Sequence, residues 1–383
     1  MFSSEGKKKR ERIIALDLLR GAFLVAIFVN HIDWSPTLFD FITGQSRLFA
    51  SAAEGFFAIS GILVGYIYGP KVLKQTKDTF LRLFRRAGWL YLLTIGFTTL
   101  YTVITLFLPP ETVRSQFLHP TFFDFLFNTV TLQFNYGWAD FLSRYAVLMA
   151  FAPFVIWLVA KGKGWLVALV SFLVWFFLRD SNFNHFTAWQ IIFFAGICIG
   201  YYLPTIEGKV LSIPSHLKRF AWPALLSFSV ITFFLNIIAA VLLPIVAGEL
   251  ESVTSPVLYS NILTIIDIRT ALDTSWFNKE TLEIGRLIIG TIWFATLYIL
   301  FRKNEDKINS KTKGSLLLLG TNSLYVYGLQ SFILFMMDIF LDAPDAASFL
   351  LKTLVVANAV VLVYVLTKHR VRIRGYRKRI VRI

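Results

Sequence analysis

Residues 13–34 have the sequence IIALDLLRGAFLVAIFVNHIDW, which is long and apolar enough to cross a bilayer, yet it contains Asp17, Arg20 and His31. Ionisable side chains in hydrocarbon are costly, and they usually face the interior of a helix bundle or a water-filled path. Arg20 and His31 are eleven positions apart. That separation is roughly three helical turns, so both side chains lie on nearly the same face, about 16 Å apart. One side of this helix therefore presents a guanidinium near one membrane surface and an imidazole towards the other.

The composition is that of a polytopic α-helical membrane protein. Of the 383 residues, 56% are hydrophobic and only 16% are charged. Apolar runs of about 20 residues recur along the chain, and they lack the alternation that a membrane β-barrel requires. The formal net charge of +15 suggests a nucleic-acid partner. However, most Lys and Arg residues fall in every second connection between apolar runs, as the positive-inside rule describes, so no nucleic acid is expected.

We expect an all-α fold of about ten transmembrane helices in the cytoplasmic (inner) membrane, with both termini cytoplasmic. The expected spans are 13–33, 50–69, 87–108, 139–160, 164–178, 186–204, 220–246, 282–301, 315–338 and 347–367. The basic segment 71–86 is expected to be an inner loop and 247–280 a longer outer loop. The apolar stretch 122–134 is too short to cross, so we expect a re-entrant or surface helix.

The expected organisation is a basic cytoplasmic N-terminus (1–12), one transmembrane domain (13–367) and a basic cytoplasmic tail (368–383). The tail is expected to lie on anionic lipid headgroups. Within the second span, small residues form a stripe whose usual explanation is close helix packing. They are Ala50, Ser51, Ala52, Gly55, Ser60, Gly61 and Gly65.

Polar groups near the outer ends of the first two spans are candidates for proton transfer. Imidazole titrates near neutral pH and is the commonest general base for activating a hydroxyl, so His31 comes first. Asp33 and Glu54 are the candidates to orient its ring, and the sequence leaves open which of them does so. Asp17 is expected to pair with Arg20, one turn away. The alternatives are that Arg20 only snorkels to the inner interface and that His31 only caps the outer end of the span.

The same region carries a family resemblance. RGAFLVAIFVNH (20–31), followed by SAAEGFFAISGILVGYIYG (51–69), resembles the opening of the acyltransferase-3 superfamily of membrane O-acyltransferases, and within it the OpgC family. Further fragments fit in the same order: RRAGWLY (85–91), LSRY (142–145), FTAWQIIFFAGICIG (186–200) and LGTNSLYVYG (319–328). They extend over most of the chain, although residues 205–310 show no recognisable motif.

The resemblance implies an acyltransferase-3-like bundle. It also implies transfer of a succinyl or acetyl group from cytoplasmic acyl-CoA to a hydroxyl of a periplasmic or cell-surface glycan. The family's essential histidine falls on His31 and its arginine on Arg20. Its inner-mouth arginines fall on Arg85 and Arg86, with Arg82 completing an RxxR pattern. The expected donor is succinyl-CoA or acetyl-CoA, and no metal is expected.

The residue types suit the roles that the resemblance implies, with arginines at the donor and His31 at the acceptor hydroxyl. Arginine suits the phosphates of CoA because its planar fork donates bidentately and stays charged. The alternative for Arg82, Arg85 and Arg86 is that they only follow the positive-inside rule. In the expected mechanism His31 removes a proton from the acceptor hydroxyl, which attacks the thioester carbonyl. An acyl-His31 intermediate is the variant, and the sequence does not separate the two.

On the outer side, the residues expected to line a sugar site are Asp140, Arg144, Trp189 and Gln190. A charge such as Arg144 within a span needs an anion or an aqueous cavity. The alternative for Gln190 is a structural hydrogen bond between helices. Two positions depart from the family pattern. Asn30 stands where the family usually has Asp before the histidine, and Ser143–Arg144 where it tends to have Pro and an apolar residue.

Two other classes of function remain open on the sequence. A transporter or flippase for an anionic or glycan-lipid substrate would use the same intramembrane charges as a path. A scaffold in an envelope assembly would tolerate substitution of Arg20 and His31 together. The expected partners are the lipid bilayer, acyl-CoA and the glycan acceptor, and a homodimer is compatible with the sequence.

Overall fold

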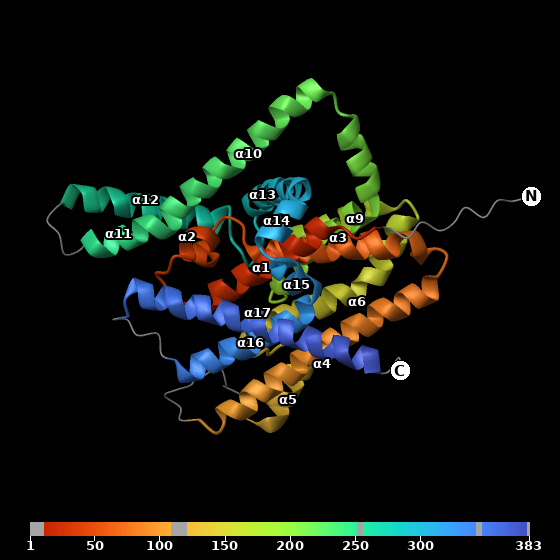
Figure 1. Ribbon diagram of the computed structural model, residues 1–383, viewed down its shortest axis with the longest axis horizontal. Helices are drawn as coiled ribbons and strands as arrows, with labels where there is room; N and C mark the ends of the chain where they lie inside the picture. The colour runs from red at the N-terminus through yellow and green to blue at the C-terminus, as the bar shows by residue number, and fades with distance from the viewer. Residues whose placement is uncertain (1–10, 109–120, 251–255, 342–346, 381–383) are drawn as a thin grey trace, which may run out of the picture.

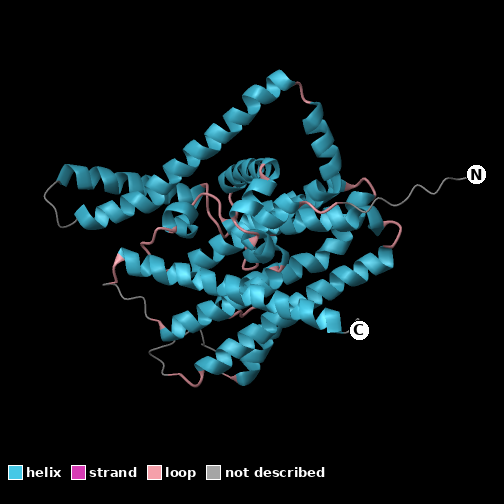
Figure 2. Cartoon of the chain, in the orientation of Figure 1, coloured by secondary structure: helices cyan, strands magenta, loops and turns pink. Residues whose placement is uncertain are grey.

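The computed structural model describes residues 11–108, 121–250, 256–341 and 347–380, and every regular element in these ranges is a helix (Figure 2). The expected all-α architecture is therefore confirmed. The helices, labelled in Figure 1, are α1 (Ile14–Ile32), α2 (Asp40–Thr43), η1 (Gly44–Ser46), α3 (Ala52–Val72), α4 (Thr76–Thr105), α5 (Phe122–Val130), η2 (Gly137–Ala139), α6 (Asp140–Ala160), α7 (Gly164–Leu178), α8 (Asn184–Thr187), α9 (Gln190–Ser212), α10 (Ser215–Ile237), the π-helical η3 (Ile238–Leu242), α11 (Leu243–Leu250), α12 (Pro256–Ser275), α13 (Ile284–Lys303), α14 (Glu305–Lys311), α15 (Ser315–Thr321), α16 (Ser323–Phe340) and α17 (Phe349–Ile380).

Within the described residues, nine helical stretches are long and apolar enough to cross a membrane, so this is a multi-pass membrane protein. They are Ile14–Ile32, Ala52–Val72, Thr76–Thr105, Gly137–Ala160, Asn184–Ser212, Ser215–Gly248, Ile284–Lys303, Ser323–Phe340 and Phe349–Val371. The expected fifth span is α7, whose 15 residues fall short of the usual requirement of about 20. The count of ten and the orientation of the termini stay predictions. The expectations for residues 1–10 and 381–383 lie outside the described residues.

Three segments differ from their expected form. The basic segment 71–86 is mostly helix, because α4 begins at Thr76 and Lys, Arg and Leu are good helix formers. The expected outer loop 247–280 contains the end of α11 and all of α12, which extend together to the left of the bundle in Figure 1. The expected ninth span is interrupted at Asn322, whose Nδ2 donates a hydrogen bond to the carbonyl of Leu318 over 2.9 Å.

The short helix expected within 122–134 is α5, which has nine residues. It packs on α4, where the Tyr91 hydroxyl donates to the carbonyl of Val130 over 2.8 Å. A helix of this length reaches about 14 Å and cannot cross the bilayer.

Helix α1 lies at the centre of the bundle, in contact with α3, α13, α15 and α16. A Cβ atom on Gly21 would lie 2.0 Å from the carbonyl oxygen of Leu316, and one on Gly320 would lie 1.8 Å from that of Asp17. The backbones of α1 and α15 therefore touch, and only glycine permits this at the two positions. Through this contact α1 buries Asp17 and Arg20, each 7% exposed, inside protein.

Helices α3 and α9 pack in the same way. A Cβ atom on Gly61 or Gly65 would lie 2.2 or 2.1 Å from a carbonyl oxygen of α9. In return, a Cβ on Gly200 would lie 2.0 Å from the carbonyl oxygen of Ile62. The close approach expected from the small residues of the second span is confirmed, and it fixes α3, which carries Glu54 and Ser60, against the bundle.

Replacing Gly200 by alanine is expected to destabilise the protein, because the new methyl group meets backbone atoms that cannot rotate away. Overpacking of this kind costs about 1–3 kcal/mol in the free energy of unfolding. Gly208 is the matched control: it belongs to the same helix and has no atom within 4 Å of its Cβ position. Gly208→Ala should be neutral or slightly stabilising. Thermal unfolding of the two purified variants checks this, and equal melting temperatures would contradict the packing described.

Candidate active site

Arg20 is a buried cation with no carboxylate within ion-pair distance among the described residues. Its Nη2 donates to Ser60 Oγ over 3.3 Å, its guanidinium lies 5.4 Å from the centre of the Phe56 ring, and its Nε has no partner. The expected pairing with Asp17 is wrong. Asp17 binds Nε of Arg12 at 2.5 Å instead, because Arg12 reaches it from the exposed start of the helix. A buried guanidinium requires an anion or water, so Arg20 is placed to receive one.

Arg86 of α4 is the second buried or half-buried cation of the site. We call Arg20 and Arg86 the inner cluster, after the side of the membrane on which the sequence places them. Arg86 is half-buried, its Nη2 donates to the Tyr145 hydroxyl over 2.8 Å, and its guanidinium lies 5.7 Å from the centre of that ring. Both Arg86 and Tyr145 are close enough to Arg20 to act on its charge. Two neighbouring guanidinium groups repel one another unless an anion lies between them. Arg82 and Arg85, by contrast, are exposed on the surface of α4.

An aromatic layer adjoins the inner cluster. The Phe56 ring packs edge-on against Phe141, with centroids 5.3 Å apart, and Phe141 stacks on Tyr327 at 4.9 Å. The cavity lined by these rings, Arg86 and Tyr145 measures only about 20 Å³. That is room for about one water molecule. This cavity is therefore too small to hold a substrate.

His31 is exposed at the end of α1, and its Nδ1 donates a hydrogen bond to the carbonyl of Ile27 over 2.6 Å. A carbonyl oxygen only accepts, so Nδ1 carries the proton. In the neutral ring Nε2 then keeps its lone pair, which is the form that a general base requires. The orienting group is thus one turn back on the same helix. The expected role for Asp33 is not seen: this residue, at φ 55°, accepts a hydrogen bond from Gln45 over 3.2 Å.

The first turns of α6 place further groups beside His31. Arg144 and Asp140 form an ion pair of 2.7 Å, and the Arg144 guanidinium lies 5.2 Å from the centre of the buried Trp189 ring. Asp140, Arg144 and Lys279 are all close enough to His31 to act on its charge. The structure therefore gathers three of the four residues expected at a sugar site. Lys279, in the expected outer loop, gave no sequence signal.

Gln190, the fourth, is occupied by other protein groups. Its Oε1 accepts from Ser171 Oγ over 2.5 Å, and its Nε2 donates to the carbonyls of Ser171 and Thr187 over 2.7 and 3.2 Å. Both amide hydrogens are used. Gln190 therefore joins α9 to α7, as its structural alternative proposed.

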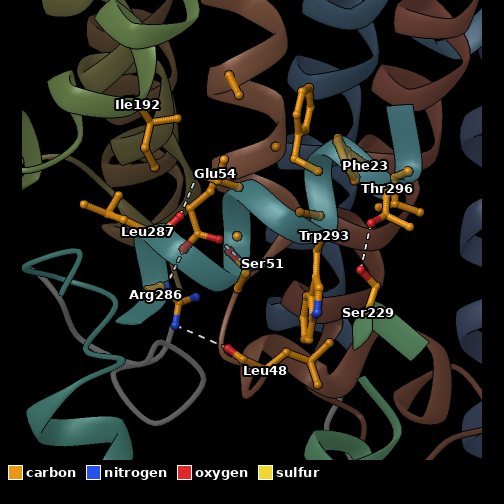
Figure 3. A pocket seen from close by; sticks show the side chains of 18 of the residues that line it. Phe23, Leu48, Ser51, Glu54, Ile192, Ser229, Arg286, Leu287, Trp293 and Thr296 are labelled. Carbon is orange, nitrogen blue, oxygen red and sulfur yellow. Dashed lines mark hydrogen bonds and ion pairs between the residues drawn. The ribbon is translucent and has the colours of Figure 1, made fainter. Parts of the chain in front are cut away.

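Glu54 forms a buried ion pair with Arg286 of α13 (Figure 3) and is not a partner of His31. Arg286 Nε donates to Glu54 Oε1 over 2.5 Å, and its Nη1 donates to the carbonyls of Leu48 and Phe277 over 3.3 and 3.0 Å. The Arg286 side chain is only 2% exposed and the Glu54 side chain 9%. Sequence reasoning missed Arg286, although an arginine inside the eighth expected span was a signal of a buried partner.

The arrangement can do two things chemically. On the expected inner side, Arg20 and Arg86 can hold an anion. On the expected outer side, the Nδ1 proton of His31 is held by Ile27, so in the neutral ring Nε2 is available to accept a proton. Two adjacent residues of α6 connect the two groups. Tyr145 accepts a hydrogen bond from Arg86, and Arg144 is close enough to His31 to act on its charge. No group of His, Cys, Asp and Glu in the described part of the chain is arranged to hold a metal ion.

Substitution of the Glu54–Arg286 pair tests whether Glu54 stabilises the fold or takes part in catalysis. Glu54→Gln leaves the Arg286 charge buried and uncompensated, which should lower the free energy of unfolding by about 3–5 kcal/mol. Adding Arg286→Met removes the orphaned charge and should recover most of that loss. Denaturation of the single and double variants measures both effects. Unchanged stability of Glu54→Gln together with lost activity would instead place Glu54 in the chemistry.

Comparison with known proteins bears on the whole of this site. A family model described as OpgC protein matches residues 12–374. The match includes both clusters, and also residues 205–310, where the sequence showed no recognisable motif. No curated protein and no solved structure matches the chain. Because the family model covers nearly the entire chain, this protein belongs to the OpgC family.

Proposed function

We propose that this protein is a membrane O-acyltransferase of the cytoplasmic membrane. It moves a succinyl or acetyl group from cytoplasmic acyl-CoA to a hydroxyl of a periplasmic or cell-surface glycan. Membership of the OpgC family is consistent with a glucan-modifying acyltransferase. The observation that carries the proposal is Arg20, a guanidinium 7% exposed with no carboxylate partner in the described structure and with Arg86 nearby. Such a pair of cations calls for an anionic ligand.

The donor supplies that anion. CoA carries phosphates, which arginine binds bidentately, and a succinyl group would add a carboxylate. In this proposal Arg82 and Arg85, exposed on α4, attract the CoA phosphates, while Arg86 and Arg20 hold the anionic group nearest the bundle interior. The Arg86–Tyr145 hydrogen bond fixes the guanidinium on that side of α6.

The acceptor binds at the outer end of α1. The Trp189 side chain and the Asp140–Arg144 pair offer an aromatic surface and polar groups, which suit a sugar. His31 Nε2 takes the proton of the acceptor hydroxyl as its oxygen attacks the thioester carbonyl. The carbon–sulfur bond breaks, the ester forms, and the CoA thiolate leaves to be protonated by solvent. An acyl-His31 intermediate would divide this transfer into two steps.

The aromatic layer must open for the two substrates to meet. In this proposal the rings of Phe56, Phe141 and Tyr327, which pack together beside Arg86, lie across the route between the inner arginines and His31. Rotation of these side chains, rather than movement of the glycine-packed helices α1, α3, α9 and α15, is the smaller change. Exclusion of water until the donor is bound would also limit hydrolysis of the thioester.

His31→Ala is expected to lower the rate of acyl transfer by about 10²–10⁴-fold, because it removes the general base. His216→Ala is the matched control, since His216 is an exposed histidine in the first turn of α10. The measurement is transfer from radiolabelled acyl-CoA by the purified full-length variants.

In cells, mass spectrometry of the surface glycans should show an ester with wild type and with His216→Ala, and none with His31→Ala. Equal transfer by the His31 variant would contradict the proposal. Substrate flux into vesicles without acyl-CoA, and no ester product, would favour a transporter instead.

Arg86→Ala is expected to raise the KM for acyl-CoA. A charge-assisted hydrogen bond is worth about 1.5–3 kcal/mol, so the increase should be about ten- to a hundredfold, with a smaller change in kcat. Arg20→Ala should act in the same direction. Arg219→Ala is the control, because Arg219 is an exposed arginine of α10 on the same expected side of the membrane. Unchanged kinetics in an Arg20→Ala, Arg86→Ala double variant would show that the inner cluster only shapes the fold.

A further inference from the structure

A cavity of about 680 Å³ lies apart from the candidate active site (Figure 3). Its walls come from α3, α9, α10 and α13, and α1 contributes Phe23 and Ala26. At about 100° per residue, Phe23 points about 60–80° and Ala26 about 120–140° around α1 from Arg20 and His31. The cavity is therefore neither the inner arginine cluster nor the outer sugar site. Its volume is within the range of about 300–1,000 Å³ that small-molecule sites occupy.

The walls of the cavity are apolar along most of their length. Most of its few hydroxyl groups bond to protein: Ser229 Oγ lies 2.7 Å from Thr296 Oγ1, and Thr291 Oγ1 donates to the carbonyl of Leu287 over 2.7 Å. Ser51 Oγ has no hydrogen-bond partner among the described residues. A sugar in this space would find few hydrogen-bond partners, and its own hydroxyls would be desolvated at a cost. The lining therefore selects a hydrocarbon chain.

One end of the cavity is polar. Arg286 lines it and is only 3% exposed. Its Nε and Nη1 donate to Glu54 and to backbone carbonyls, whereas its Nη2 has no hydrogen-bond partner among the described residues. Buried donors are almost always paired in native proteins, so this nitrogen requires an acceptor oxygen. The guanidinium group matches the oxygens of both carboxylate and phosphate groups, and membrane phospholipids supply the phosphate.

The shape of the cavity matches a chain with a polar head. The lining residues of α13 extend from Arg286 to Leu300, which is about 21 Å of helix, compared with about 30 Å for the hydrocarbon core. Helices α9 and α10 diverge from their shared turn at residues 213–214 (Figure 1), and both line the cavity, through Ala195 and Leu226 among others. The cavity is not fully enclosed, so a lipid can enter it from outside the bundle.

We propose that this cavity binds a membrane phospholipid. One acyl chain lies along α13, and the phosphate accepts a hydrogen bond from Arg286 Nη2. The lipid fills the space between the α3–α9 pair and the α10–α13 pair, two units that share little direct packing. This site goes beyond the proposed acyl transfer and does not depend on it.

The test uses the full chain reconstituted in vesicles of phosphatidylethanolamine and phosphatidylglycerol. A trace of phosphatidylglycerol carries a diazirine on its acyl chain, and mass spectrometry locates the crosslinks after irradiation. We expect labelling of Ile62 and Thr296, which line the cavity and are 3% and 4% exposed. Bulk lipid around the protein cannot reach them. This pattern tests the proposal on the unaltered protein.

A matched pair of variants sharpens the result. Ala195 lines the cavity and is exposed, so Ala195→Phe fills the space without disturbing the core and should abolish labelling of Ile62 and Thr296. Ala168→Phe, an exposed alanine on α7 outside the cavity, should leave it unchanged. Labelling confined to outward-facing residues, equal labelling in both variants, or stronger labelling by a water-soluble diazirine would each overturn the proposal. None of these readouts requires acyl transfer.

Discussion

The structure depends on holding one guanidinium, that of Arg20, inside a membrane bundle with no counter-ion among the described residues. Backbone contacts make this possible, since Gly21 meets Leu316 and Gly320 meets Asp17 so closely that α1 is enclosed by protein. The energetic cost of an unpaired buried charge is large, and other buried arginines of this chain avoid it. Arg286, for example, has Glu54 and two backbone carbonyls. The charge of Arg286 is thus balanced by Glu54 within the protein, whereas the charge of Arg20 is left for an anionic ligand.

The two halves of the proposed reaction meet on α6. Tyr145 holds Arg86 beside Arg20, and its neighbour Arg144 stacks on Trp189 close to His31. Between them the aromatic rings leave space for about one water molecule. A closed path is what an enzyme needs when its donor is a thioester on one side and water lies on both sides. In the proposed reaction, the donor and acceptor regions stay apart until side chains of the aromatic layer move.

The sequence predicts what depends on local pattern. Hydropathy identified α1 and most other spans, and helical periodicity placed Arg20 and His31 on one face. What it missed depends on tertiary contacts: the partner of Glu54 is Arg286, 232 positions away, and that of Gln190 is Ser171 on α7. The His31 ring binds its own helix at Ile27, although carboxylates nearby in the sequence were more obvious partners. Helical order in α12 was also missed, because its moderate hydropathy resembles that of an outer loop.

A structure of the full-length protein with a non-hydrolysable acyl-CoA analogue tests the central claim most directly. The account predicts an anionic group of the donor between the guanidinium groups of Arg20 and Arg86, with the acyl carbonyl directed along α6 towards His31. It also predicts displaced rings at Phe56, Phe141 or Tyr327. An analogue bound in the large apolar cavity beside Arg286, or bound with Arg20 still contacting only Ser60, would contradict it.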